Sequence, residues 1–190
     1  MESVKDLLVE IKEKSELIVD LAYSALILDS EDMAKEVEKL EKEMYELAYK
    51  IKISTMLAAN NWEEAEQLAG ILQVAEASKN LANAAADIVY LLDIDIAMRP
   101  FLPSLFLNAD EKIHAVKIYP NSSIVDRKIG ELNIEKETGV RVIAIKRGRR
   151  WIYDPEDNVR IKADDILILR GTEDGYNFME RVARGEESWD

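Results

Sequence analysis

The sequence contains no cysteine, one histidine, four prolines and seven glycines among its 190 residues. Without cysteine the chain can form no disulfide, no thiolate metal site and no cysteine nucleophile, which fits a reducing compartment. It also lacks any run of ~18 to 20 apolar residues, the length that crosses a bilayer. We therefore expect a cytoplasmic protein that does not insert into a membrane and is peripheral to one only through a partner.

Positive charge is scarce as well. The chain has 25 lysines and arginines against 38 acidic residues, a formal net charge of −13. Because a general nucleic-acid binder needs clustered cations for its phosphate contacts, we expect no nucleic-acid partner. The glycine-rich loops of dinucleotide and P-loop sites are missing too, since Gly70 is alone in the first half.

Catalytic signatures are also missing. His114 has no serine and acid context that would suggest a triad, and no other nucleophile–base pair is recognisable. We therefore predict that the protein is not an enzyme.

The first half has the pattern of long amphipathic helices. Apolar residues recur at alternating steps of three and four over residues 3–28 and 31–58, which indicates helices that pack lengthwise. Asp29 or Ser30 can cap the second helix, and Asn60 or Asn61 a third that runs to about Ile96. The alanines expected on the core side of that third helix are Ala65, Ala69, Ala75, Ala82 and Ala86. Residues 1–99 therefore read as an antiparallel three-helix bundle.

Residues 100–109 form a predicted linker. Arg99-Pro100 stops the third helix, because proline lacks the amide and disfavours helix in the residue before it. The segment is unusually apolar for a linker, so we expect it to lie against a domain or a second subunit.

Beyond the linker the period changes to two, which indicates strands. A helix is expected after a proline-marked turn and a serine cap within 120–132, and a final helix at 174–184. Gly148 allows a hairpin turn. The expected strands cover residues 113–119, 140–147, 149–155 and 158–171. Residues 110–190 therefore read as a small α+β domain with a mainly antiparallel sheet.

This second domain resembles the TrkA-C domain, the RCK C-lobe of potassium channel and transport regulators. The resemblance is carried by "SSIVDRKIGELNIEKETGVRVIAIKRG" and "YDPEDNVRIKADDILILRGTEDGYNFM". Ala163 stands where the family often has glycine before the aspartate. The family implies a homodimer that binds a small anionic or nucleotide ligand, such as cyclic di-AMP, near its dimer interface.

The adjacent acids Asp164 and Asp165 precede the last predicted strand. An aspartate that leads into a buried strand can accept backbone hydrogen bonds and fix the turn, and the resemblance gives this place to Asp165. Asp164 is then expected to be solvated. A catalytic dyad is the alternative, but adjacent strand residues point to opposite faces.

The first half resembles one three-helix repeat of the PhoU family, in "SALILDSEDMAKEVEKLEKEMYELAYKI" and "LQVAEASKNLANAAADI". PhoU proteins usually carry two such repeats, and a homodimer would restore that count. PhoU helices can hold metal through acids spaced i, i+4. At the matching places, Glu41 with Tyr45 and Glu76 with Asn80, the second acid is missing. A further pair, Glu16 and Asp20, has the spacing but not the family position, and we predict no metal site.

A cationic cluster is the strongest candidate for ligand binding. Lysine and arginine beside aromatic side chains suit phosphate or nucleotide recognition. The alternative is an exposed hairpin whose cations offset the acidic bundle. Asn121 and Ser122, at the expected helix cap, could bind an anion through free amides or only cap the helix. The candidate ligand residues are Asn121, Ser122, Lys146, Arg147 and Arg149, with Trp151 and Tyr153 following them.

Together these features favour a non-enzymatic regulatory subunit or ligand sensor for potassium or other cation transport. It would act as a cytoplasmic homodimer whose helical bundle meets a membrane channel or transporter subunit. The alternative is a PhoU-type metal-binding or phosphate-signalling regulator in which the TrkA-C domain only dimerises the chain.

Overall fold

The computed structural model describes residues 3–94 and 110–189. The chain divides into two compact units, Met1–Arg99 and Pro100–Asp190. The predicted linker at 100–109 lies outside the described residues. Each unit is therefore treated by itself.

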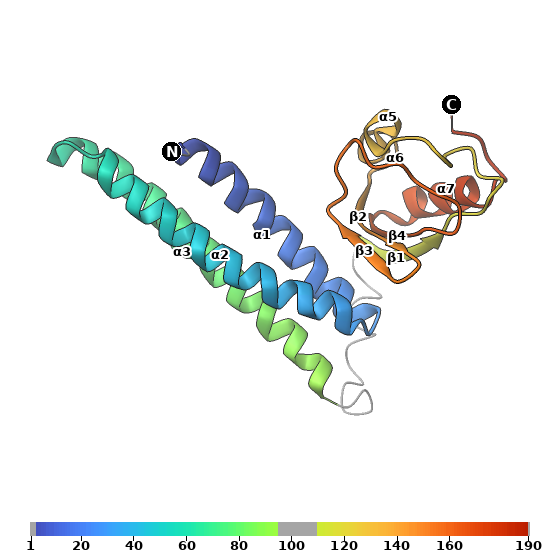
Figure 1. Cartoon of the computed structure of the whole chain (residues 1–190), viewed down its shortest axis with the longest axis horizontal. Helices are drawn as coiled ribbons and strands as arrows, with labels where there is room; N and C mark the ends of the chain where they lie inside the picture. Colours follow the sequence, from blue (N-terminus) through green and yellow to red (C-terminus); the bar gives the residue numbers. More distant parts are fainter. Residues whose placement is uncertain (1–2, 95–109, 190) are drawn as a thin grey trace. The chain divides into compact units, whose positions relative to one another are not determined.

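The first unit consists of three long helices that run side by side, as Figure 1 shows. They are α1 (Val4–Ile27), α2 (Glu31–Ala58) and α3 (Trp62–Tyr90). Ser30 caps α2 by accepting a hydrogen bond from the Met33 amide, and Asn61 caps α3 through the Glu64 amide. These caps satisfy amides that a helix start leaves unpaired. The predicted antiparallel three-helix bundle is confirmed.

The core of this unit is built from large side chains on α2 and from small side chains on α3. The apolar residues that recur along α2, which form its seam, are all buried: Met33, Val37, Leu40, Met44, Leu47 and Ile51. The buried residues of α3 are instead small, namely Ala75, Ser78, Ala82 and Ala85, with Val89 at the end. Small side chains allow the backbone of α3 to approach its neighbours closely.

Two predictions for α3 were wrong. Ala65 and Ala69 are exposed and Ala86 is only half-buried, because the buried stripe follows a different phase of the helix. The helix also ends before Ile96: a 3₁₀ turn, η1 (Leu91–Asp93), follows Tyr90, and Ile94 has extended backbone angles. Such tightening is common at helix C-termini, where carbonyls lack helical partners.

The second unit is built on a four-stranded antiparallel sheet with strand order β1-β4-β2-β3. Its elements are β1 (Lys112–Lys117), α5 (Ile129–Leu132), α6 (Ile134–Thr138), β2 (Val140–Arg147), β3 (Arg150–Tyr153), β4 (Ile166–Gly171) and α7 (Glu173–Ala183). Gly148 has a positive φ of 61° in the β2–β3 turn, a conformation that glycine adopts without steric cost. The predicted α+β class with an antiparallel sheet is confirmed.

Two elements predicted in this unit are present but begin later than expected. Residues 120–127 form turns rather than a helix, and the short α5 begins after Lys128. The last strand begins at Ile166 and not at residue 158, although Ile161 is fully buried. The backbone of Ile161 bonds to Asp126 and Arg127 instead of to the sheet, which explains why an alternating pattern there is not a ladder strand.

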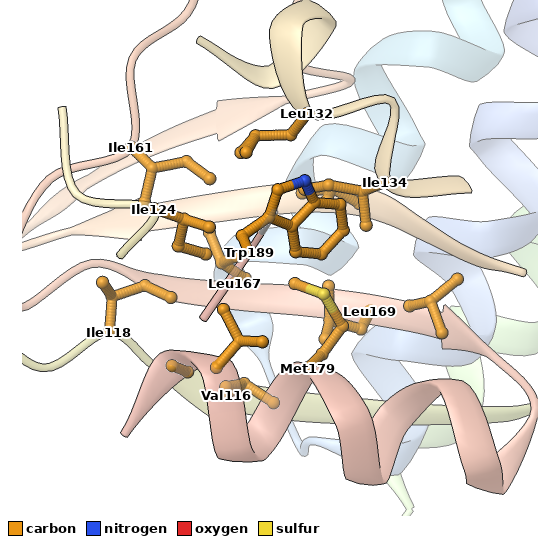
Figure 2. Close-up of a cluster of buried hydrophobic side chains, with 14 of the residues drawn as sticks. Val116, Ile118, Ile124, Leu132, Ile134, Ile161, Leu167, Leu169, Met179 and Trp189 are labelled. Carbon is orange, nitrogen blue, oxygen red and sulfur yellow. The ribbon is translucent and has the colours of Figure 1, made fainter. Parts of the chain in front are cut away.

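The core of the second unit lies between the sheet and α7, as Figure 2 shows. Val116, Leu167 and Leu169 of the sheet and Met179 of α7 belong to this core. Trp189, six residues past the end of α7, joins the same cluster and is 8% exposed. Its amide donates to Ser123 Oγ at 2.9 Å, and its carbonyl accepts from Arg127 at 3.2 Å. The C-terminal tail therefore folds back and closes the core.

Candidate functional site

Asp165 is the centre of a buried hydrogen-bond network at the start of β4. Its side chain is 0% exposed, and Oδ2 accepts from the Lys162 amide at 2.8 Å. Arg147, at the end of β2, donates from Nε to Oδ1 at 2.8 Å and from Nη2 to Oδ2 at 2.7 Å. Nη2 also donates to the Arg160 carbonyl at 2.7 Å. The predicted turn-fixing role of Asp165 is confirmed, and its arginine partner was missed.

The antiparallel register explains this partnership. Lys146 is opposite Ile166 in the β2–β4 ladder, so the next residue of β2 meets the residue before Ile166. A buried carboxylate requires a cation or several donors, since its desolvation is costly. The sequence could therefore indicate that a buried Asp165 needs a positively charged partner. It could not identify Arg147 as that partner before the strand register was known. Hydrogen bonding to Asp165 also raises the pKa of Arg147.

Asp164 lies in a different environment. Its side chain is 70% exposed, and Oδ1 is 2.8 Å from Lys117 Nζ. The residue has a positive φ of 67° and belongs to the turn, not to a strand. The two carboxylates therefore do not share a site, and the dyad alternative is wrong.

Asn121 and Ser122 hold the end of α7. Asn121 Nδ2 donates to the Arg184 carbonyl at 2.9 Å, and Ser122 Oγ donates to the Val182 carbonyl at 2.7 Å. These bonds satisfy carbonyls that the last turn of a helix leaves without partners. Neither residue lies at the N-terminus of a helix, so the geometry behind their predicted anion binding is absent from this turn. Their role as ligand residues stays a prediction.

The β2–β3 hairpin gathers cationic and aromatic side chains. Lys146 is opposite Trp151 in the ladder, and its Nζ lies 5.1 Å from the centre of the Trp151 ring. The rings of Trp151 and Tyr153 stack with centroids 5.8 Å apart and planes 7° from parallel. Arg149 is exposed in the turn. An arrangement of flat rings with adjacent cations can bind a planar anion.

The five predicted ligand residues are thus divided by the structure. Lys146 and Arg149 lie on the hairpin beside the aromatic pair. Arg147 binds Asp165, because successive strand residues point to opposite faces. Asn121 and Ser122 contact the end of α7.

His114 packs inside the second unit. Its ring stacks on Tyr176 of α7 with centroids 3.8 Å apart, and Nε2 lies 3.8 Å from Glu173 Oε2. Burial lowers the pKa of His114, and the nearby Glu173 opposes that shift. The position is structural and offers no arrangement of a triad.

Two of the positions that match the PhoU metal ligands, Glu76 and Tyr45, make other contacts. Glu76 Oε2 accepts from Lys52 Nζ at 2.6 Å, and Lys79 pairs with its other oxygen. These hydrogen bonds, first from Lys52 and then from Lys79, lower the pKa of Glu76 to about 2. Tyr45 donates its hydroxyl to Asn83 Oδ1 at 2.6 Å.

The described residues contain neither a metal-binding cluster nor a membrane-spanning helix. Within residues 3–94 and 110–189, no three His, Cys, Asp or Glu side chains form a group that could hold a metal ion. Over the same ranges, every helix is too short or too polar to span a bilayer.

Comparison with known families agrees with the two resemblances. The family model of the PhoU domain matches residues 8–92, and that of the TrkA-C domain matches residues 113–183. The chain therefore contains a PhoU domain followed by a TrkA-C domain.

The chain spans only part of the length of the curated relatives that it matches. The chain is 33% identical over 78 residues to Ktr system potassium uptake protein C of Bacillus subtilis, covering 40% of this chain and 35% of that protein. It is 30% identical over 69 residues to an uncharacterized transporter of Synechocystis sp., covering 36% of this chain and 11% of that protein. Among solved structures, the RCK C domain of the potassium transport protein KtrA, in complex with cyclic di-AMP, is 30% identical. That match covers 44% of this chain and 96% of the other, with a TM-score of 0.36.

Proposed function

We propose that this chain, which joins a PhoU domain to a TrkA-C domain, is a non-enzymatic regulatory subunit of a potassium or other cation transport system. The observation that carries the proposal is the 78-residue likeness to a potassium uptake protein. The TrkA-C match at residues 113–183 agrees with it. The protein acts in the cytoplasm, and its helical domain meets a membrane channel or transporter subunit.

The regulatory step is a ligand-dependent change in a homodimer. Two TrkA-C domains pair, and a small anionic or nucleotide ligand such as cyclic di-AMP binds near their interface, as the family resemblance implies. A ligand shifts such an equilibrium only by its difference in affinity for the two arrangements. The helical domains transmit the change to the membrane partner.

The direct ligand contacts in this proposal are Lys146 and Arg149. Both lie on the hairpin that carries the stacked Trp151 and Tyr153. The proposal assigns no direct contact to the other three predicted ligand residues, Arg147, Asn121 and Ser122, since each already binds a carboxylate or a carbonyl within the fold.

Equilibrium dialysis and thermal-shift measurements with cyclic di-AMP, other nucleotides and inorganic phosphate test the proposal. We expect one nucleotide to bind and to raise the unfolding midpoint, since a ligand that binds only the folded state stabilises it. The double variant Lys146→Gln/Arg149→Gln should lose this binding. Lys136→Gln, an exposed cation on α6, is the matched control and should retain it. Equal loss in the control, or no binding by any nucleotide, would contradict the site.

Sedimentation equilibrium tests the homodimer separately. The proposal requires a dimer at micromolar concentration, and a monomer there would contradict it. Dimerisation through the TrkA-C domain has to persist when the ligand site is removed by the double variant, because Lys146 and Arg149 are assigned to the ligand alone.

The PhoU match supports a second candidate, a metal-binding or phosphate-signalling regulator. Against it, the two lysines that hold Glu76 would have to be displaced by a metal. Elemental analysis of protein purified without chelator separates the candidates. Bound iron or zinc that is lost in Glu41→Gln/Glu76→Gln would favour the second.

A further inference from the structure

Helix α3 carries a second apolar stripe, largely exposed, beside the stripe that packs into the bundle core. Its members recur at heptad spacing and are Gly70, Val74, Ala77, Leu81, Ala84 and Ile88, which we call the α3 seam. Val74 is 49% exposed and Leu81 43% exposed, and only Ile88 is half-buried. The buried stripe of α3 runs through other residues, from Ala75 to Val89. The helix is therefore apolar on two faces, of which the bundle uses one.

Heptad spacing suits a helix as the partner. Alternating steps of three and four keep a stripe in line with a helix that supercoils around it. The seam is about 27 Å long at a rise of 1.5 Å per residue. None of its six members is charged.

The order of side-chain sizes identifies the partner as a second copy. Small and larger residues alternate along the seam. An antiparallel pair with its twofold axis between Ala77 and Leu81 places Gly70 opposite Ile88, Val74 opposite Ala84, and Ala77 opposite Leu81. Every layer then joins one small and one larger side chain, which fills space evenly. A parallel pair would join Ala77 to Ala77 and Leu81 to Leu81, so that empty layers would alternate with crowded ones.

The flanking charges agree with this arrangement. The exposed edge of the seam carries Gln73, Asn80 and Asp87 at heptad-equivalent positions. In the antiparallel pair the two Asn80 residues lie beside the axis, about 3 Å apart along the helices, and Asp87 lies equally near Gln73 of the other copy. The parallel pair would oppose the two Asp87 carboxylates, and like charges repel. For a chain with net charge −13, a nearly uncharged face is where two copies can approach at lowest electrostatic cost.

We propose that the α3 seams of two copies pair antiparallel about this axis, so that two PhoU-like bundles form one six-helix unit. A single helix pair of this length is smaller than a standard interface of about 1,600 Å². The TrkA-C pairing proposed above raises the effective concentration of one seam for the other. The affinity of the α3 pair thus depends on that homodimer, whereas its geometry does not.

Cross-linking of single-cysteine variants tests the geometry, and the natural chain contributes no cysteine background. Asn80→Cys, at the axis, should link to its partner through a short bis-maleimide. Gln73→Cys is the matched control on the same edge, since its two copies would lie about 18 Å apart along the helices. We expect Asn80→Cys to link at least about tenfold faster, because adjacent thiols have a high effective concentration. The double variant Gln73→Cys/Asp87→Cys should link efficiently again.

The added variant Leu81→Glu, at an exposed position, should abolish linking in Asn80→Cys while circular dichroism shows intact helices. Equal rates for Asn80→Cys and Gln73→Cys would overturn the pairing. A sedimenting dimer in which Asn80→Cys does not link would overturn the α3 pair and leave the TrkA-C dimer standing. Efficient linking combined with a monomeric Leu81→Glu variant would uphold the α3 pair and refute the TrkA-C dimer. A wild-type monomer without linking would refute both.

Discussion

The two units of this protein stabilise comparable lengths of chain by different means. The second unit closes one core with Trp189 and neutralises the fully buried Asp165 with Arg147. The helical unit leaves apolar residues exposed along α3 and keeps its best-paired carboxylate, Glu76, 43% exposed. The comparison shows that the second unit buries its C-terminal tail and an acidic side chain within one core, whereas the helical unit has apolar surface suited to contacts with partners.

The largest effect is expected from removing the arginine that pairs with the buried Asp165. Arg147→Met would leave the Asp165 carboxylate buried with the Lys162 amide as its remaining donor, and removing one member of such a pair costs about 3–5 kcal/mol. Urea unfolding followed by Trp151 and Trp189 fluorescence measures the loss. The matched double variant Arg147→Met/Asp165→Leu should recover much of the stability, because it removes the unpaired charge as well. A single variant as stable as the wild type would show that the pair is dispensable.

Removal of the C-terminal indole should follow in size. Trp189→Ala deletes a large side chain from the core, and such changes cost about 3–5 kcal/mol; we expect a loss at the lower end of this range. Hydrogen exchange measured by mass spectrometry should show faster exchange in β4 and α7 but not in α1–α3. The control is Trp62→Ala, because Trp62 is 85% exposed in the helical unit. Faster exchange confined to the last five residues would mean that the tail does not support the core.

A smaller effect is expected where α3 packs by small side chains. Ala82→Leu would insert a branched side chain at a position that is 0% exposed, and overpacking costs about 1–3 kcal/mol. Thermal unfolding followed by circular dichroism at a helix-sensitive wavelength measures it. Ala65→Leu, on the exposed side of the same helix, should have little effect. An unchanged midpoint for Ala82→Leu would show that the bundle has room to relax.

Sequence periodicity predicted what depends on local spacing. The seam of α2 and the caps at Ser30 and Asn61 follow from neighbours within one or two turns, and the structure confirms them. The second apolar stripe of α3 was not recognised, because a helix rich in alanine satisfies more than one phase. Burial in the folded bundle was needed to choose between them.

Contacts between distant residues could not be predicted in this way. The pairing of Arg147 with Asp165 depends on the register of two strands, and the polar tail before Trp189 gave no sign that the chain turns back. The same limit applied to the prediction of the ligand residues. Lys146 and Arg147 are adjacent in sequence, yet only the register shows that the latter is bound to a carboxylate.

The smallest effect concerns Glu76, whose pKa of about 2 lies below its ordinary value of 4.5 because of Lys52 and Lys79. The depressed pKa means that its contribution to stability is present above about pH 4.5 and is lost as the pH falls toward 2. Since the side chain is 43% exposed, salt should screen this contribution, whereas the pair of Arg147 with the fully buried Asp165 should respond less.

Unfolding midpoints of wild type and Glu76→Gln, measured between pH 6 and pH 2 at low and high salt, test this difference. We expect the variant to lose less stability on acidification, with the gap closing at high salt. Glu46→Gln, an exposed acid on α2, serves as the control and should follow the wild type. If the unfolding midpoint of Glu76→Gln falls with pH in parallel with that of the wild type at low salt, the lysine contacts do not stabilise the helical unit. The contrast between its solvated charges and the buried pair of the second unit would then concern geometry alone.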